Sequence, residues 1–436
     1  MREMKDSGIE WIGEIPKDWK TCKLLYCLRQ SICDGPHETP KFIEQGIPFI
    51  SVDSLNDTKE VNLDIVKRFI SEGDYNNYMT KARLENGDIL FSKSATIGKT
   101  AIVGKEKFMI WSPLAVLKNS PKICNRDYLY YLLNCEHLIT SIRLSGSYNT
   151  QANVGMRQIE KAQITLPRLE TQDKITSYLD SKCSKIDDII EKQQSVIEKL
   201  KAYKQSIITE AVTKGLNPDV PMKDSGVEWI GEVPEHWKVK KLKYVGKFVN
   251  GYAFPSNAFK NSGTLVMKIS NIQPMKIIWD EKSFVDKKYE DLTSYCVHKG
   301  DLVFALTRPI INGGIKTAIA NNHETVLLNQ RNAMFKGNRE ISTKWQYYLM
   351  QSKMFIQEFA LYIDGTGQQP NISTNEISNI KVMLPDLKEQ KQIADYLDQK
   401  CSAIDSTIAN KQALIEKLTA YKKSLIYEVV TGKKEV

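Results

Sequence analysis

The chain has 436 residues, of which 42% are hydrophobic and 26% are charged, as is typical of a globular protein of about two to four domains. Its formal charge of +9 favours an anionic partner but is shared by both halves, +3 in residues 1–218 and +6 in residues 219–436. No long apolar run and no apolar signal segment is present, so no membrane partner is expected. The eight cysteines are scattered without a Cys-x-x-Cys pair, and we expect a reduced, cytoplasmic protein.

The first segment is a polar arm that contains two tryptophans. Residues 4–20 read MKDSGIEWIGEIPKDWK, and residues 222–238 read MKDSGVEWIGEVPEHWK, 218 positions later. The matching tryptophans are Trp11, Trp19, Trp229 and Trp237. Tryptophan can stack on nucleobases, but its place in a repeated segment beside a proline favours packing of the arm against the rest of the chain.

The arm leads into a region of short β-like runs followed by helical stretches. The runs IPFISV at 47–52, DILF at 88–91 and KTAIV at 99–103 are apolar and β-branched, and residues 126–142 have a helical pattern. In the second half, the matching runs are residues 265–269, 301–304 and 316–320, with a helical stretch at 342–362. These runs and helical stretches predict one compact α/β module in each half.

A long helix is expected after each module. Residues 170–214 contain no glycine or proline, and their apolar residues recur at spacings of three and four, which gives each helix one narrow seam. Two similar seams favour pairing of the helices as an antiparallel coiled coil, each a rod of roughly 60 Å. Lys204 and Lys422 recur within the seams, where they either fix the register or extend to solvent at a loosely packed end. The predicted seam residues are Leu179, Cys183, Ile186, Ile190, Ile197, Leu200, Ile207, Leu397, Cys401, Ile404, Ile408, Ile415, Leu418 and Leu425.

The second half repeats the first, so the chain is a tandem duplication. The helix-forming segments from Leu166 and Leu384 match at the same offset of 218 as the arms, whereas the modules between them diverge and share only landmarks such as Gly-Asp at 87–88 and 300–301. We expect an α+β protein with a pseudo-twofold internal repeat. The expected segments are a first module with its arm (1–165), a helical spacer (166–214), a linker with the second module (215–383) and a second spacer (384–436).

Several patterns that could suggest catalysis fail on inspection. Gly98-Lys99-Thr100 resembles the end of a phosphate-binding loop, but Lys93 stands where that motif needs its first glycine, and the second copy lacks Gly98. The five histidines show no metal-ligand spacing. A duplicated enzyme would be expected to repeat its catalytic residues, whereas here the frame repeats and the modules do not.

These features together resemble the DNA-specificity subunits of type I restriction-modification systems. The resemblance covers nearly the whole chain and rests on the order module, helix, module, helix. The segments that carry it are Asp34-Gly-Pro-His-Glu-Thr-Pro40, Gly46-Ile-Pro-Phe-Ile50, Asn250-Gly-Tyr-Ala-Phe254 and Gly365-Thr-Gly-Gln-Gln-Pro-Asn-Ile372. It implies two target-recognition domains that each recognise one half of an asymmetric, bipartite sequence in double-stranded DNA, with the helices setting the gap.

The resemblance also implies partners and a division of labour. Two copies of a modification (methyltransferase) subunit would supply adenine methylation with S-adenosylmethionine, and restriction subunits would add translocation and cleavage with ATP and Mg²⁺. The chain itself would bind no cofactor and no metal, and would not be an enzyme.

Candidate DNA contacts follow from residue chemistry within the modules. Arginine, asparagine and glutamine can bond base edges, and lysine mostly holds phosphates. The candidates are Lys93, Lys99, Arg143, Tyr148, Asn149, Gln151, Arg157, Arg308, Asn312, Lys316, Gln330, Arg331 and Gln368. Gln151 and Gln369 lie at matching places, which favours a structural turn over base contact there. A coiled-coil adaptor for protein partners is the alternative; it explains the helices but not the divergence of the modules.

Overall fold

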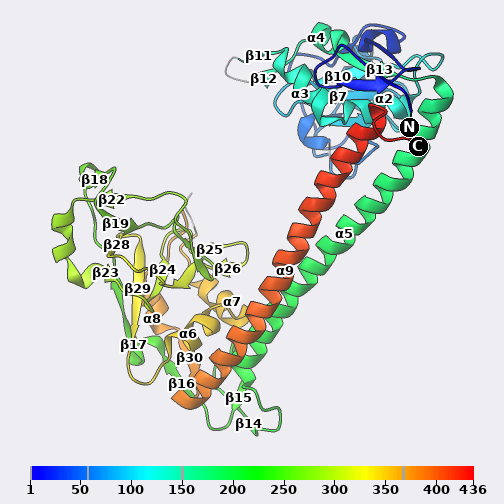
Figure 1. Ribbon diagram of the computed structural model, residues 1–436. Helices are drawn as coiled ribbons and strands as arrows, with labels where there is room; N and C mark the ends of the chain where they lie inside the picture. The colour runs from blue at the N-terminus through cyan, green and yellow to red at the C-terminus, as the bar shows by residue number, and fades with distance from the viewer. Residues whose placement is uncertain (1, 56–57, 149–151, 366–368) are drawn as a thin grey trace. The chain divides into compact units, whose positions relative to one another are not determined.

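The computed structural model describes residues 2–55, 58–148, 152–365 and 369–436 (Figure 1). The chain forms two compact units, residues 1–193 with 413–436 and residues 194–412. The boundary between the units therefore falls inside each long helix, so that each unit contains one module and a part of both helices. In the described ranges, no helix has the length and hydrophobicity that crossing a bilayer requires.

The first unit is built on a four-stranded antiparallel sheet of order β4-β10-β7-β8 and a three-stranded sheet of order β6-β5-β9, in which β5 and β9 run parallel. The arm is a hairpin of β1 and β2, and β3 pairs with β13 at the two ends of the module. The strands are β1 (Met4–Asp6), β2 (Glu14–Pro16), β3 (Lys20–Lys23), β4 (Cys33–Asp34), β5 (Ile47–Ile50), β6 (Phe69–Ile70), β7 (Ile89–Ser92), β8 (Thr100–Ile102), β9 (Met109–Ile110), β10 (Leu114–Leu117), β11 (Ser147–Tyr148), β12 (Ala152–Asn153) and β13 (Gln163–Leu166).

The second unit repeats this topology with additions. Its four-stranded sheet has the order β17-β29-β24-β27, its second sheet has the order β18-β22-β19-β28-β23, and β19 and β28 again run parallel. The arm is β14 with β15, and β16 pairs with β30. The strands are β14 (Met222–Asp224), β15 (Glu232–Pro234), β16 (Lys238–Lys241), β17 (Gly246–Asn250), β18 (Phe259–Lys260), β19 (Thr264–Met267), β20 (Ile272–Gln273), β21 (Lys276–Ile277), β22 (Phe284–Val285), β23 (Cys296–Val297), β24 (Leu302–Ala305), β25 (Ile310–Ile311), β26 (Gly314–Ile315), β27 (Thr317–Ile319), β28 (Val326–Leu328), β29 (Asn332–Gly337) and β30 (Lys381–Leu384).

Each helical stretch expected within a module is two helices. Residues 126–142 divide at Cys135, and residues 342–362 divide at Ser352, whose hydroxyl caps the second helix by accepting a hydrogen bond from the amide of Phe355. Ser352 offers the backbone this alternative bond, which periodicity alone does not reveal, whereas Cys135 makes no capping bond through its side chain. The short helices are α1 (Glu72–Met79), α2 (Arg126–Leu133), α3 (Glu136–Leu144), α4 (Met156–Lys161), α6 (Thr343–Met350), α7 (Lys353–Leu361) and α8 (Thr374–Asn379).

The two long helices, α5 (Leu169–Lys214) and α9 (Leu387–Val430), pack against each other within each unit (Figure 1). In the first unit the buried seam residues are Leu179, Cys183, Ile186 and Leu425, and in the second they are Ile197, Ile207, Leu397, Cys401 and Ile404. Ile190, Leu200, Ile408, Ile415 and Leu418 are half-buried. Several of these side chains also join the core of the adjoining module, which fixes each helix end to a module.

The same ion pair forms once in each unit between the two helices. The Lys204 amine lies 2.7 Å from the Asp405 carboxylate, and the Lys422 amine lies 2.7 Å from that of Asp187. On α5, Lys204 follows Asp187, whereas on α9 the partner of Lys204, Asp405, precedes the partner of Asp187, Lys422. The helices therefore run antiparallel. Both seam lysines therefore have a defined partner, and the members of the two pairs differ by the repeat offset of 218.

Reversing one of these charges should weaken the pairing, and restoring the pair in reverse should recover it. We expect Lys204→Asp to destabilise the second unit by roughly 1 kcal/mol, because it places two carboxylates together at a partly exposed site. Adding Asp405→Lys should recover most of that loss. Chemical denaturation of the single and double variants measures both effects; additive losses would contradict a direct interaction.

A buried glutamine anchors the start of each long helix. The side chain of Gln172 accepts a hydrogen bond from the amide of Asn125 and donates to the carbonyls of Ile123 and Pro167. Gln390 makes the same three contacts, with Ser342, Glu340 and Pro385. Both glutamines have no exposed surface. The join between module and helix is therefore part of the repeated frame.

Candidate nucleic-acid interface

The loops at one edge of the second unit bring several predicted DNA contacts together. The amide of Leu306, just after β24, donates to the carbonyl of Arg331, just before β29. The loop that contains residues 369–370 contacts both of these segments. The Arg308 amide donates to the Pro370 carbonyl, and the Arg331 guanidinium donates to Oε1 of Gln369 at 3.0 Å. Arg308, Asn312, Gln330 and Arg331 are all exposed. The edge therefore presents arginine and amide groups, the side chains suited to base edges.

A hairpin projects from this edge. β25 and β26 pair across a turn in which Asn312 has φ +49° and Gly313 has φ +76°, the left-handed pair that closes a two-residue hairpin with the twist of its strands. Arg308, at the base of the hairpin, also has a left-handed φ of +47°. Such conformations are unfavourable for residues with a side chain and tend to occur at functional sites.

The two lysines that repeat most clearly have internal partners. The amine of Lys99 donates to the carbonyls of Leu55 at 2.8 Å and Val52 at 3.4 Å, and the amine of Lys316 donates to that of Ile269. Val52 and Ile269 are equivalent in the repeat. Burial, with the nearby Arg308 charge, lowers the pKa of Lys316. These contacts tie the strand after the loop to its neighbouring sheet, which favours a structural role for both lysines.

The predicted contacts of the first unit are less exposed. Lys93 is 8% exposed and its amine lies 3.2 Å from the Asp34 carboxylate. Arg143 donates to the carbonyl of Ile97 at 2.7 Å and lies 3.7 Å from Glu136. Burial in an ion pair makes Lys93 a poor phosphate ligand, because contact with DNA would require breaking that pair. Arg157 on α4 is exposed and remains available to a polyanion.

Four predicted contacts cannot be placed as side chains. Asn149, Gln151 and Gln368 lie outside the described residues, and Tyr148 is described only as part of the backbone of β11. Gln369, the counterpart of Gln151, bonds Arg331, so this turn position contacts a candidate base-reading arginine.

The structure shows where the sequence patterns that could have suggested nucleotide, nucleobase or metal binding lie. Gly98 has φ +103°, and its amide donates to the Ser92 carbonyl, so Gly98 and Lys99 close the turn between β7 and β8, and Thr100 begins β8. Trp19 and Trp237 are each 1% exposed, as packing of the arm predicts. In the described ranges no group of three His, Cys, Asp or Glu side chains is placed to hold a metal ion.

Sequence reasoning missed the function of the Gly-Asp landmark. Asp88 pairs with Lys118, and both side chains are 4% exposed; the equivalent Asp301 pairs with Lys336. Each carboxylate also accepts a hydrogen bond from a backbone amide three residues earlier, that of Glu85 or His298. Lys118 and Lys336 are separated by the repeat offset of 218, and this match was the signal in the sequence that could have indicated the two ion pairs. These pairs link adjacent strands of the four-stranded sheet in both units.

Comparison with known proteins decides what this frame belongs to. The family model "Type I restriction modification DNA specificity domain" matches residues 38–199 and 234–420. The chain belongs to this family. It is 30% identical over 424 residues to the type I restriction enzyme MjaVIII specificity subunit of Methanocaldococcus jannaschii, covering 96% of this chain and 93% of that protein.

Two further comparisons agree with this assignment. The chain is 28% identical over 212 residues to the EcoAI specificity subunit of Escherichia coli, covering 48% of this chain and 35% of that protein. A solved chain from a study of type I restriction-modification complex assembly has the same fold, with a TM-score of 0.70 at 13% identity, covering 96% of this chain and 99% of that one. This specificity subunit therefore has two target-recognition domains, one in each unit.

Proposed function

We propose that each target-recognition domain contacts one half of an asymmetric, bipartite sequence in double-stranded DNA. The contact is made through the loops at one end of its four-stranded sheet, those that follow β7 in the first unit and β24 in the second. The observation that carries the proposal is the exposed group Arg308, Asn312, Gln330 and Arg331 at that edge of the second unit. The corresponding loop of the first unit has a different length and different side chains, so the two domains should recognise different bases.

The repeated frame would dock two copies of a methyltransferase subunit. An antiparallel helix pair that carries the same ion pair twice offers two equivalent surfaces, and equivalent surfaces suit identical partners. Methylation of adenine with S-adenosylmethionine, and ATP- and Mg²⁺-dependent translocation and cleavage by restriction subunits, would be carried out by these partners. The present chain would contribute DNA recognition and spacing, without a catalytic group.

An exchange of modules within the chain tests this function. β3 pairs with β13 and β16 pairs with β30 in the same register, so both modules begin and end on adjacent strands. Replacing residues 24–162 by residues 242–380 would place the second module in both frames. We expect the methylated sequence to become an inverted repeat of the second half-site, because the helices pair antiparallel. Mapping methylated adenines in cells that express the methyltransferase with each chain measures the outcome.

The reciprocal exchange is the control, and it should yield an inverted repeat of the first half-site. A methylated sequence that stays unchanged in either exchange would refute the model of two independent readers. The adaptor alternative predicts that methylation is retained with no dependence on which module is present.

A further inference from the structure

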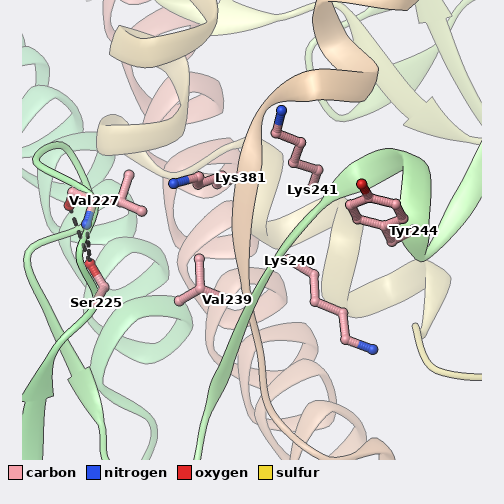
Figure 2. A pocket seen from close by; sticks show the side chains of 7 residues that line it. All are labelled: Ser225, Val227, Val239, Lys240, Lys241, Tyr244 and Lys381. Carbon is pink, nitrogen blue, oxygen red and sulfur yellow. Dashed lines mark hydrogen bonds between the residues drawn. The ribbon is translucent and has the colours of Figure 1, made fainter.

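A shallow cavity of about 640 Å³ opens in the second unit between the arm, β16 and β30 (Figure 2). It lies away from the candidate DNA-contacting loops. Three lysine side chains extend from its two strands, and no carboxylate belongs to its lining. The lining residues are Ser225, Val227, Val239, Lys240, Lys241, Tyr244 and Lys381.

The surface around this cavity is repeated in the first unit. The Ser225 hydroxyl accepts a hydrogen bond from the Val227 amide at 3.1 Å, and Ser7 does the same with Ile9 at 3.1 Å. Gly226 and Gly8 have nearly equal φ angles of +66° and +69°. We call the set Ser7, Ile9, Lys23 and Tyr26, and its counterpart Ser225, Val227, Lys241 and Tyr244, the tyrosine face of each unit.

The tyrosines of these faces are exposed to nearly the same extent. Tyr26 is 63% exposed and Tyr244 is 64% exposed. A single exposed aromatic residue needs no explanation, but the same one at the same place in both halves of a diverged duplication does. Tyrosine is one of the residue types enriched among the anchors of protein interfaces.

Three lysines line the cavity in or beside the second tyrosine face. Lys241 and Lys381 are direct partners across β16 and β30, where like charges repel. Lys240 forms an ion pair with Glu340, whereas Lys241 and Lys381 have no ion-pair partner in the described part of the chain. An acidic group from outside would relieve this repulsion.

The face lies at the opposite end of the sheet from the candidate DNA-contacting loops. Asn338, which follows β29, donates to the Tyr244 carbonyl, and Arg331 precedes the first residue of β29. The six residues of this strand separate the two by roughly 20 Å. In the first unit the Ser120 amide, after β10, donates to the Cys27 carbonyl beside Tyr26. This placement favours a protein partner over the DNA held by the loops.

We propose that the tyrosine face of each unit docks one methyltransferase subunit, through an acidic segment of that partner that also covers the tyrosine. The proposal rests on the proposed function, which supplies two identical partners. The two docking sites are unequal, because Lys381, which lies beside Lys241 of the second face, corresponds to the uncharged Gln163 beside Lys23 of the first. The second face therefore binds its partner more tightly at low salt.

The complex of this chain with its methyltransferase subunit provides the test. Native mass spectrometry should show two partner copies on the unmodified chain and one copy on either Tyr26→Ala/Lys23→Glu or Tyr244→Ala/Lys241→Glu. With both pairs changed, neither copy should remain bound. The variant that keeps the second face should bind its one copy roughly tenfold more tightly than the variant that keeps the first, and the difference should disappear at high salt.

Lys282→Glu/Lys299→Glu is the matched control, because both lysines are exposed in the second unit but neither lines the cavity; it should retain two copies. Circular dichroism verifies that each variant folds. Retention of both copies by the folded quadruple variant would overturn the proposal, and so would a uniform loss of DNA affinity with both copies still bound, which would assign the face to DNA phosphates. If the unmodified chain bound no methyltransferase, the proposed function itself would fail.

Discussion

Lys118→Ala should destabilise the first unit by about 3 kcal/mol, whereas Lys336→Ala should cost the second unit about 1 kcal/mol or less. The two lysines make equivalent ion pairs, but Lys118 and Asp88 are each 4% exposed, while Lys336 and Asp301 are 33% and 15% exposed. Removing the amine leaves the Asp88 charge buried with less compensation, whereas water can solvate Asp301.

Hydrogen exchange of the sheet strands measures this difference. Peptides that cover β7 and β10 should exchange faster in Lys118→Ala, and those of β24 and β29 should change little in Lys336→Ala. The double variant Asp88→Leu/Lys118→Met should recover much of the stability, because it removes both charges and keeps their volume. Equal losses in the two single variants would show that burial does not set the contribution of this pair.

Asn312→Gly should relax base recognition in the second half of the target sequence alone. Asn312 is exposed at the tip of the β25–β26 hairpin with φ +49°. Glycine adopts this conformation readily, so the substitution removes the amide without disturbing the turn. A bidentate amide contact contributes about 1–3 kcal/mol of discrimination, so we expect a loss of about 5- to 150-fold at one base position.

Methylation rates on sites varied one base at a time measure that discrimination. Asn321→Gly, at an exposed asparagine between β27 and β28, is the matched control and should leave every position unchanged. A uniform fall in rate across all sites would show that Asn312 holds the backbone, and a change in the first half would contradict the assignment of one half-site to each domain.

The burial of the two cysteines in the helix pair could be predicted from residue type and periodicity. Cys183 and Cys401 were expected as small buried seam residues, and each is 4% exposed. Burial raises the pKa of both thiols to about 11, so they are neutral and poorly nucleophilic at neutral pH. Periodicity determined their positions because a helix face is a property of local sequence.

The sequence by itself determined the duplication, the long helices, their seams and the frame that joins each module to its helix. These features depend on local periodicity and on a repeat at constant offset, which need no coordinates. The candidate DNA-contacting side chains could not be ranked in the same way. The partner of Lys93 is Asp34, 59 positions earlier, and Lys316 bonds the carbonyl of Ile269, 47 positions earlier.

Only the tertiary structure decided which cations are available to DNA and where the two modules differ. Burial depends on contacts with segments that are distant in the sequence. The sequence alone therefore does not distinguish a lysine in an internal ion pair from a lysine exposed to solvent. The structure also shows that the repeated Lys99 and Lys316 tie two sheets together, while the hairpin bearing Asn312 is particular to the second domain. Residues shared by the two halves hold the frame because the frame is common to both, and the different half-sites proposed for the two domains would require residues that differ.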